Sequence, residues 1–376
     1  MNFEWDNKLF MKLVTLILAG GLLLCAQAQA ADPDLQRLVT RLYVEGKLHG
    51  GIHIAEGDEV LLSQAWGIAD DEGQQVLTPD HTFGINSLGK MFTSILIMQM
   101  VEEGILALDD PLSEHYPAFG HPRSGEITIH QLLSHRSGLP DYAMAQIRGV
   151  MPSDLRGIER LNAVAAMSLD FEPDTRFNYS NTGFYLLGLI VERYREDGYG
   201  NQLRKRIFEP LEMNHTAHDP KEATTIMPVY YTGDGSAIRE VKGSDLEPGD
   251  GGVSTMQDLH KFLSALGSET LLTADSWNRM FTPHSLPSES IEGAWPPPHQ
   301  EPYGYGFSIM ELPYAGDETA RAVGHGGAGL GSNYVVRYLD SPRIVIVWNN
   351  IFKNPVIPEV FEFLAEDRAT GNRHET

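Results

Sequence analysis

One apolar run constrains the fold of this chain more than any other feature of its sequence. Directly after Ser87 comes "LGKMFTSILIMQMVEEG", a segment without proline that is apolar at most of its positions. A helix with a single apolar stripe can lie at a surface, but a helix that is apolar nearly all round has to be covered on every side. The sequence therefore predicts a buried helix that ends at Gly104, with other elements packed around it.

A serine and a lysine stand three residues apart at the start of this run. Positions i and i+3 of a helix share one face, so we expect Ser87 and Lys90 to project side by side. A free serine hydroxyl is a weak nucleophile, and it needs a base within hydrogen-bond reach. The same spacing also arises by chance at solvated helix ends, so the pair needs support from the rest of the chain.

Segments with strand character lie near both ends of the sequence. The stretch "GGIHIAEGDEVLLSQAWGIAD" predicts two strands joined at residues 56–58, and "YGFSIMEL", "SNYVVRYL" and "RIVIVWNN" are typical of consecutive antiparallel strands. Helical spacing predicts a helix over residues 32–48 and another over 355–367. We therefore expect an α+β fold with one antiparallel sheet that is built from both termini and flanked by helices.

The middle of the chain alternates short helical patterns with loops and predicts a mainly helical insertion. A chain of 376 residues with 42% apolar content can bury a full core. We expect a signal peptide over 1–30 and one domain over 31–376. Within that domain the sheet part is predicted at about 31–116 and 288–376, and the helical insertion at about 117–287.

The first thirty residues have the composition of an export signal. An apolar stretch over residues 13–25 is followed by small residues at Ala28 and Ala30, where a signal peptidase would cleave. Thirteen residues are short for a membrane-spanning helix, although an uncleaved anchor is an alternative. We expect an exported protein, periplasmic or secreted, without stable membrane insertion after cleavage. The sequence leaves open whether translation starts at Met1 or Met11.

Charge and cysteine content exclude several classes of function. The net charge of -23 argues against nucleic acid and anionic membranes as partners. The single cysteine, Cys25, lies in the expected signal peptide, so the mature chain would have no disulfide, no thiolate nucleophile and no cysteine metal site. No His-Glu-x-x-His pattern occurs. We expect no metal and no cofactor, and the oligomeric state is open.

Two further motifs carry polar groups that suit a cleft. Tyr179 and Asn181 lie just ahead of the apolar segment "TGFYLLGLIVE", where loop side chains can converge on a site. A second Tyr-x-Asn at residues 199–201 has no apolar run after it and is the weaker candidate. His135 and Ser137 are two residues apart and need not meet, so that a structural helix and turn is the preferred interpretation there.

The glycine-rich stretch "GHGGAGLG" matches Gly-x-Gly-x-x-Gly between Gly324 and Gly329. A dinucleotide site would need a helix after the motif and an acidic residue about twenty positions further on. Here a strand follows instead. The glycines are better explained as positions where a strand backbone approaches a ligand closely.

Taken in order, "SLGK", "YSN" and "HGG", with "LLSHRSGLPDY" between the first two, resemble the serine beta-lactamase and penicillin-binding protein superfamily. The resemblance is greatest to its class C branch, which includes esterases and D-amino-acid peptidases, and it covers about residues 35–348. It implies a beta-lactamase/transpeptidase-like fold and a serine hydrolase that acts through an acyl-enzyme on ester or amide bonds of small molecules or peptides. The alternatives are a D-Ala-D-Ala-type carboxypeptidase, a beta-lactamase, or a non-catalytic penicillin-binding-like module.

The resemblance implies that Ser87 is the nucleophile and that Lys90 and Tyr179 are its catalytic partners. Unperturbed lysine and tyrosine side chains are both protonated at neutral pH, so the environment has to favour the basic form of one of them. Burial would favour a neutral amine at Lys90, whereas a charged Lys90 would favour a phenolate at Tyr179. The sequence leaves both possibilities open.

The resemblance also implies a set of substrate-binding residues: Asn181, His325, Gly326, Gly327 and Ala328. The backbone N–H groups of Ser87 and Ala328 would form the oxyanion hole. Where relatives have Lys-Thr-Gly, this chain has His325 and Gly326 before the last glycine, so a fixed cation and a hydroxyl are both missing. An imidazole is only partly charged near neutral pH. Neutral esters or amides are therefore expected to be better substrates than carboxylate-bearing lactams.

Overall fold

The structure is a computed structural model. It describes residues 32–70, 75–222, 230–231, 237–238, 247–292, 301–315, 318–329, 331–350 and 356–369. The expected signal peptide lies outside these residues, so cleavage near Ala30 stays a prediction. Within the described ranges, no helix is both long enough and apolar enough to cross a membrane.

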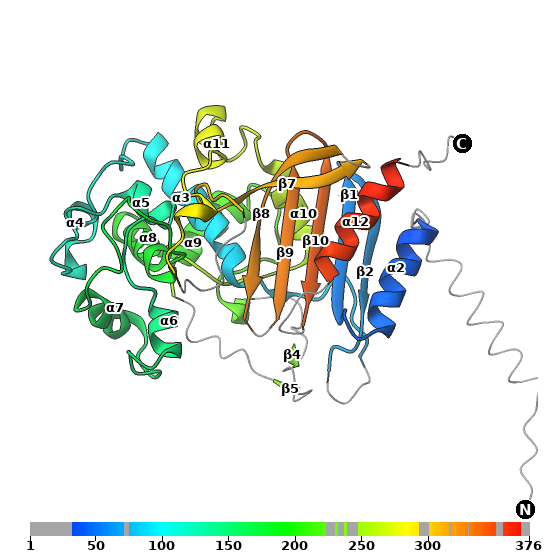
Figure 1. The fold of residues 1–376 in the computed structure, drawn as a ribbon, viewed down its shortest axis with the longest axis horizontal. Coiled ribbons are helices and arrows are strands. Elements are labelled where there is room, and N and C mark those ends of the chain that lie inside the picture. Colours follow the sequence, from blue (N-terminus) through cyan, green and yellow to red (C-terminus); the bar gives the residue numbers. More distant parts are fainter. Residues whose placement is uncertain are drawn as a thin grey trace, which may run out of the picture.

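A six-stranded antiparallel sheet joins the two ends of the chain (Figure 1). Its strands run in the order β2-β1-β10-β9-β8-β7. Their bounds are β1 (Gly50–Glu56), β2 (Glu59–Trp66), β7 (Ser308–Ala315), β8 (Glu318–Ala328), β9 (Ser332–Tyr338) and β10 (Arg343–Asn349). The first strand pairs with the last, with Ile54 opposite Val345. The predicted α+β fold, with one antiparallel sheet built from both termini, is confirmed.

The three segments predicted as strands near the C-terminal end are β7, β9 and β10, but they are not consecutive, because the strand expected at the glycine-rich stretch lies between the first two. This strand, β8, contains His325. Its sequence "ETARAVGHGGA" shows no clear alternation of apolar and polar residues, which is why the period-2 pattern fails there. The strand is fixed by pairing on both sides, with Val323 opposite Ile309 and Arg337. Such pairing outweighs the weak strand preference of alanine and glycine.

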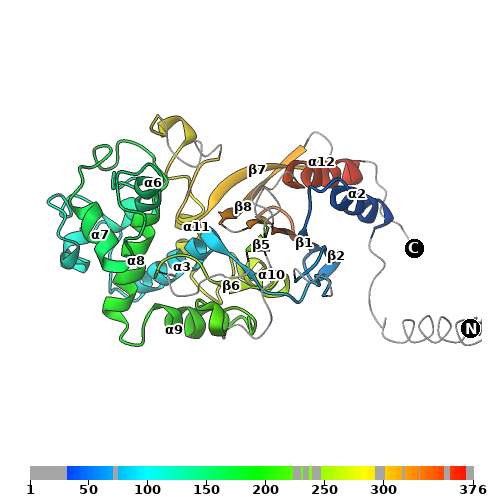
Figure 2. The ribbon, with the colours of Figure 1, turned by 90° about the horizontal axis from the view of Figure 1, so that it is seen from below.

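Helices cover both faces of the sheet. On one face lie α2 (Pro33–Val44) and α12 (Val356–Ala369), which pack with Val336 and Val345 in one apolar cluster (Figure 2). The opposite face packs against α10 (Met256–Ala265) and the central helix of the protein. The sheet is therefore the middle of three layers, which excludes water from both of its faces.

The apolar run after Ser87 forms this central helix, α3 (Gly89–Glu102). Eleven of its fourteen residues are buried, so the prediction of a helix that is covered on every side is confirmed. It ends as predicted, because Gly104 takes a positive φ of 71° and stops the helical path.

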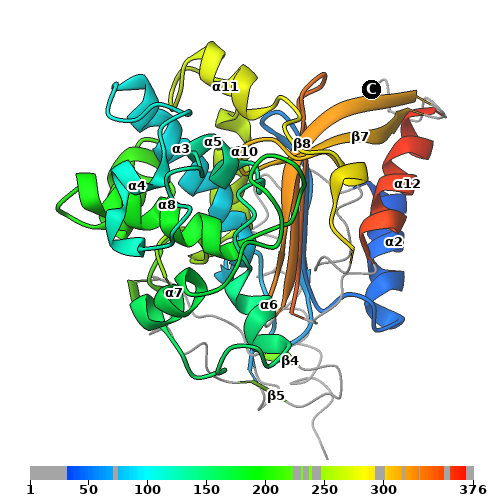
Figure 3. The same cartoon turned by 60° about the vertical axis from the view of Figure 1, so that its left-hand side comes forward.

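Most of the remaining helices gather beside the sheet, on the other side of α3 (Figure 3). They are α4 (Leu112–His115), α5 (Ile129–Leu133), α6 (Tyr142–Ile147), α7 (Gly157–Ala165), α8 (Asn181–Tyr194), α9 (Tyr199–Leu203) and α11 (Ala274–Met280). Short strands and single helical turns complete the described elements: β3 (Phe83–Gly84), β4 (Tyr230–Tyr231), β5 (Ala237–Ile238), β6 (Val253–Ser254), η1 (Asn86–Leu88), η2 (Pro117–Phe119), η3 (Arg204–Phe208), η4 (Pro220–Glu222) and η5 (Pro287–Glu289). The predicted limits of the helical insertion stay predictions, and α10, inside those limits, packs on the sheet.

A pair of histidines joins the sheet to α10. Nε2 of His53, on β1, lies 2.9 Å from Nδ1 of His260. Burial, and then the neighbouring His260, lower the pKa of His53 to about 3. His53 is therefore neutral in the folded protein across the ordinary pH range, which couples stability to pH.

We expect His53→Gln to reduce the loss of stability in mild acid. An unfolded histidine titrates near pH 6.5, so the folded state, whose His53 titrates near 3, binds fewer protons in between. The contribution of neutral His53 to the free energy of unfolding is complete above about pH 6.5 and is lost as the pH falls towards 3. Between pH 6.5 and 5.0 the free energy of unfolding should drop by about 1.5 kcal/mol more in the parent than in the variant. Urea titrations at both pH values measure this, and equal drops would contradict it.

Candidate active site

Ser87 lies in η1, the single turn that leads into α3. Lys90 follows on the first turn of α3, and its Nζ donates a hydrogen bond to Ser87 Oγ at 3.1 Å. The predicted pairing of the two side chains is therefore present in the structure. The preceding residue, Asn86, has a φ of +49°. A left-handed backbone at a non-glycine residue costs of order 1–3 kcal/mol and persists only where packing enforces it.

Tyr179 approaches the pair from the loop before α8. Its side chain is 7% exposed, and Lys90 Nζ lies 5.1 Å from the centre of its ring. Burial raises the pKa of Tyr179 well above its usual value of 10, the charge of Asp250 raises it further, and a hydrogen bond to Ser87 opposes them. Tyr179 is thus a phenol at neutral pH, which favours Lys90 of the two candidate bases.

The structure brings a carboxylate to Lys90 that the sequence did not reveal. Lys90 Nζ donates to Asp250 Oδ2 and forms an ion pair with it. Asp250 is about 160 residues further along the chain, in the loop "PGDGG" before β6. In the sequence, Asp250 stands out only as an acidic residue between two glycines, and no fixed spacing links it to Ser87.

The loop that carries Asp250 is tightly packed against the helices of the site. Gly249 has a φ of +102°, and a Cβ there would lie only 1.9 Å from the backbone oxygen of Phe184 on α8. Thr93 on α3 donates to the carbonyl of Gly249 at 2.8 Å. The N–H of Gly251 donates to the carbonyl of Asn86 at 3.2 Å. The loop is therefore joined to α3, α8 and η1, and Asp250 has little freedom to move.

Asp141 is a second carboxylate whose role was not predicted from the sequence, and it positions Asn181. Asp141 caps α6 by accepting from the N–H of Met144 at 2.8 Å, and it also accepts from the N–H of Asn181 at 2.6 Å. Burial raises its pKa, and these two backbone hydrogen bonds and the charge of Lys90 oppose that rise. Asp141 therefore connects the start of α8 to α6 and holds Asn181 at the wall of the cavity.

His325 lies on β8, and both nitrogens of its ring are engaged. Its Nε2 lies 2.9 Å from the hydroxyl of Tyr303, and its Nδ1 lies 2.5 Å from the carbonyl of Gly326. A carbonyl can only accept, so Nδ1 carries the hydrogen, and Nε2 accepts from the phenol when the ring is neutral. Burial raises the pKa of Tyr303 well above 10, which keeps this phenol a donor. The ring of His325 is therefore fixed between Tyr303 and Gly326.

Gly327 allows β8 to approach the turn that carries Ser87. A Cβ at this position would lie 2.6 Å from the backbone oxygen of Ile85 and 2.7 Å from Leu88 Cδ1. At Gly327 the close approach expected of these glycines is made to the turn that carries Ser87, whereas Gly326 faces the cavity.

A cavity of about 540 Å³ lies in front of Ser87. It brings together all the predicted site residues except Lys90, which is buried behind it: Ser87, Tyr179, Asn181, His325, Gly326, Gly327 and Ala328. Much of the remaining wall is apolar, from Met144, Ile147 and Ile357, with Glu301 as an acidic member. The described residues that line it include no lysine and no arginine.

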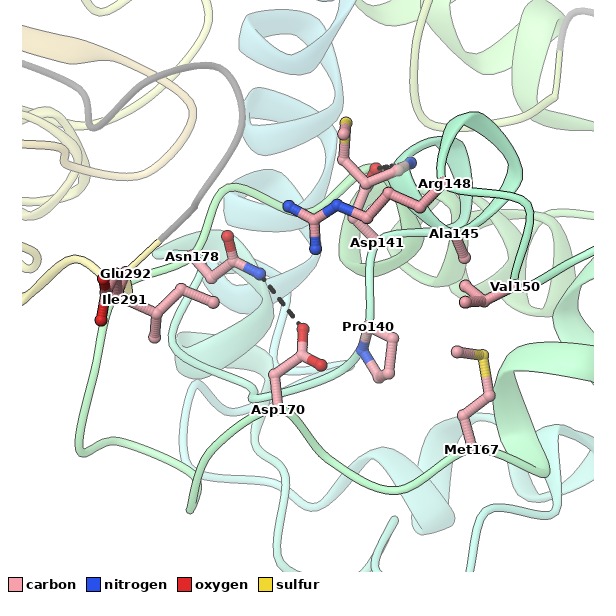
Figure 4. A pocket seen from close by; sticks show the side chains of 11 residues that line it. Pro140, Asp141, Ala145, Arg148, Val150, Met167, Asp170, Asn178, Ile291 and Glu292 are labelled. Atoms are coloured by element: carbon pink, nitrogen blue, oxygen red, sulfur yellow. Dashed lines mark hydrogen bonds between the residues drawn. The ribbon is translucent and has the colours of Figure 1, made fainter.

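Two smaller cavities adjoin the site. One of about 270 Å³ also contains Ser87 and Asn181, with Asp250 in its wall. Another, of about 300 Å³, shares Asp141 with the main cavity (Figure 4). Arg148 extends over this cavity. In its wall, Asn178 Nδ2 donates a hydrogen bond to Asp170 Oδ2 at 3.3 Å. This side cavity is therefore more polar than the main one.

The competing motifs have structural roles. The hydroxyl of Tyr199 lies 2.7 Å from that of Thr93, inside the core. Ser137 Oγ accepts from the N–H of Leu139, and the ring of His135 lies 4.3 Å, centre to centre, from that of Tyr179. Over the part of the chain that the structure describes, no group of three or more His, Cys, Asp or Glu residues is arranged to hold a metal ion.

Comparison with known proteins agrees with this geometry. The family model described as Beta-lactamase matches residues 35–366. The chain belongs to the beta-lactamase family. The resemblance predicted from the three motifs is confirmed, and with it the assignment to the serine hydrolases.

Relatives of known sequence or structure share most of the chain. Penicillin-binding protein 4* of Bacillus subtilis is 29% identical over 337 residues, which cover 84% of this chain and 71% of that protein. The crystal structure of a penicillin binding protein from Bacillus halodurans has a TM-score of 0.73 at 26% identity and covers 87% of this chain and 99% of that one. The octameric penicillin-binding protein homologue from Pyrococcus abyssi has a TM-score of 0.70 at 29% identity, covering 84% and 73%.

Gly249→Ala should destabilise the fold and displace Asp250. A Cβ at this site meets backbone at 1.9 Å, whereas one at Gly198, with a φ of +83°, has nothing within 4 Å. Gly198→Ala should therefore lose only the roughly 1–3 kcal/mol that its backbone conformation, with a ψ of 160°, costs a residue other than glycine. Gly249→Ala should lose about 1–3 kcal/mol more, because the packed loop has to shift. Urea unfolding of both variants measures this. Equal losses of unfolding free energy would show that the loop can shift at no cost in stability.

Proposed function

We propose that this protein cleaves neutral ester or amide bonds of small molecules or peptides through an acyl-enzyme on Ser87. The observation that carries the proposal is the 3.1 Å contact of Ser87 Oγ with the fully buried Lys90 Nζ, at the wall of a cavity of about 540 Å³. Membership of the beta-lactamase family supports it. A nucleophile next to its base and an open cavity are what covalent catalysis requires.

The reaction uses three side chains and two backbone donors. Ser87 Oγ bonds to the substrate carbonyl carbon while its proton passes to the neutral amine of Lys90. The leaving group departs with the proton of the Tyr179 phenol, and the ammonium of Lys90 then returns a proton to Tyr179. Water repeats the sequence and releases the acid. The N–H groups of Ser87 and Ala328 stabilise the oxyanion, a contribution that is usually a few kcal/mol.

The lining of the main cavity suits an uncharged, apolar acyl group. Met144, Ile147 and Ile357 supply apolar surface, and the described lining offers no lysine or arginine for a substrate carboxylate. His325 is a weak replacement for such a cation, because an imidazole is only partly charged near neutral pH and both of its ring nitrogens already have partners within the protein. A hydrophobic pocket with few polar groups is typical of sites that recognise neutral ligands.

A D-Ala-D-Ala-type carboxypeptidase or a beta-lactamase is the second candidate. Arg148, in the wall of the adjoining cavity, is the observation in its favour, because a guanidinium can bind a carboxylate. A non-catalytic penicillin-binding-like module is the alternative outside the enzymes. Export through residues 1–30, and a periplasmic or secreted location, also stay proposals.

Ser87→Ala should abolish covalent labelling by a fluorophosphonate probe and leave the fold intact, since it removes only a hydroxyl. Lys90→Ala and Tyr179→Phe should each lower turnover of p-nitrophenyl butyrate by roughly a hundredfold or more, the scale of a lost acid or base. Ser94→Ala, further along the same buried helix, is the matched control and should label like the parent. Labelling that survives in Ser87→Ala would make another residue the nucleophile and would contradict the proposal.

Ile147→Asp should lower kcat/KM for p-nitrophenyl octanoate about five- to tenfold relative to the acetate, because a charged side chain replaces apolar surface at the cavity. The control is Ile158→Asp. Ile158 is also an exposed isoleucine, but it is not among the residues that line the cavity. Nitrocefin should be a poorer substrate than the butyrate ester in the parent. A parent that prefers nitrocefin would favour the beta-lactamase alternative.

A further inference from the structure

We propose that Asp250 is a positioning residue that holds the amine of Lys90 within reach of Ser87 Oγ, where it can accept the proton of the serine. The inference rests on the proposed function, in which Lys90 is the base. Its tests vary Asp250 and leave Ser87 unchanged, so that the two proposals can fail separately.

The ion pair provides the compensation that a buried lysine needs. Lys90 is 0% exposed, and its Nζ contacts Ser87 Oγ on one side and the Asp250 carboxylate on the other. A buried ammonium is costly unless an opposite charge or hydrogen bonds replace its water. Nucleophile, base and a third group that orients the base form the general arrangement of an activated serine. Asp250 is the group that orients the base.

The other charged or titratable groups that face Lys90 do not take this role. From the start of α6, Asp141 already accepts the N–H groups of Met144 and Asn181. From the loop before α8, Tyr179 presents its ring and a phenol that stays protonated at neutral pH. Asp250 is therefore the carboxylate in direct contact with the amine.

The described neighbours of Asp250, apart from Lys90, carry no positive charge that would compete for its carboxylate at neutral pH. Oδ1 accepts from the N–H of Gly251 at 2.8 Å, and Oδ2 accepts from Lys90. Burial lowers the pKa of the nearby His218 to about 4, against the opposing effect of Asp250, so this histidine is neutral from about pH 5.5 upwards. Tyr199, also near Asp250, is a buried phenol whose pKa burial raises above its usual value of 10.

Asp250 also gives Lys90 a connection to solvent. Its side chain is 27% exposed and lines the cavity of about 270 Å³, whereas Lys90 has no exposed surface. An ammonium at Lys90 can pass one proton to the Asp250 carboxylate, which leaves a neutral amine and a carboxylic acid. The acid then releases that proton to water in the cavity, so the net change is the loss of one proton to solvent. A resting ammonium at Lys90 is thereby converted to the neutral base, before substrate binds, without opening of the core.

The first test is the pH dependence of Asp250→Asn. An opposite charge nearby favours the ammonium, so its removal favours the neutral amine. The acid limb of kcat/KM for p-nitrophenyl butyrate should therefore move to lower pH, while the plateau falls. Asp258→Asn is the matched control, because Asp258 is buried and accepts from the N–H of His215 at 2.7 Å, away from the site. Its acid limb should match that of the parent.

The second test is rescue of Asp250→Ala by added formate. The cavity beside Asp250 can admit this small carboxylate, so formate should raise the plateau rate several-fold and formamide should not. This measurement decides the question if Asp250→Asn fails to fold, which circular dichroism and thermal melts would show. A parental acid limb in Asp250→Asn, or equal effects of formate and formamide on Asp250→Ala, would overturn the inference. Asp250 would then be a structural residue only.

Discussion

The contact on which the site depends is the burial of one lysine amine between a serine and a carboxylate. Lys90 has no exposed surface, so its charge has to be balanced by the protein, and Asp250 supplies the balance. That requirement ties two segments about 160 residues apart to one point in the core. The packing of α3, α8 and the loop around Gly249 keeps them there.

The three layers of the fold explain why this point is rigid. α3 is covered on every side, so its first turn cannot shift without disturbing the core on which the sheet rests. Gly327 lets β8 pack against the same turn. The strained backbone of Asn86 persists because α3 and β8 hold the turn in place from both sides. Strain of this kind is typical of functional sites, where geometry is maintained at some cost in stability.

The chemistry in front of Ser87 differs from that behind it. Behind the serine lie an ion pair and a phenol, and in front of it lies a cavity with much apolar surface and no described cation in its lining. His325, engaged with Tyr303 and Gly326, lies where the resemblance to the family predicts a lysine. The main cavity therefore offers mostly apolar surface next to Ser87, and Arg148 lies in the wall of the adjoining cavity.

The sequence by itself determined what depends on neighbours along the chain. The i, i+3 geometry places Ser87 beside Lys90, the apolar run makes α3 a buried helix, and the order of the three motifs identifies the family. Only the tertiary structure decided the rest. The strand β8 forms because two partners pair with it, and Asp141 and Asp250 reach the site from loops with no fixed spacing to Ser87. Local periodicity cannot reveal such residues, because the contacts that define them are made between segments far apart in the chain.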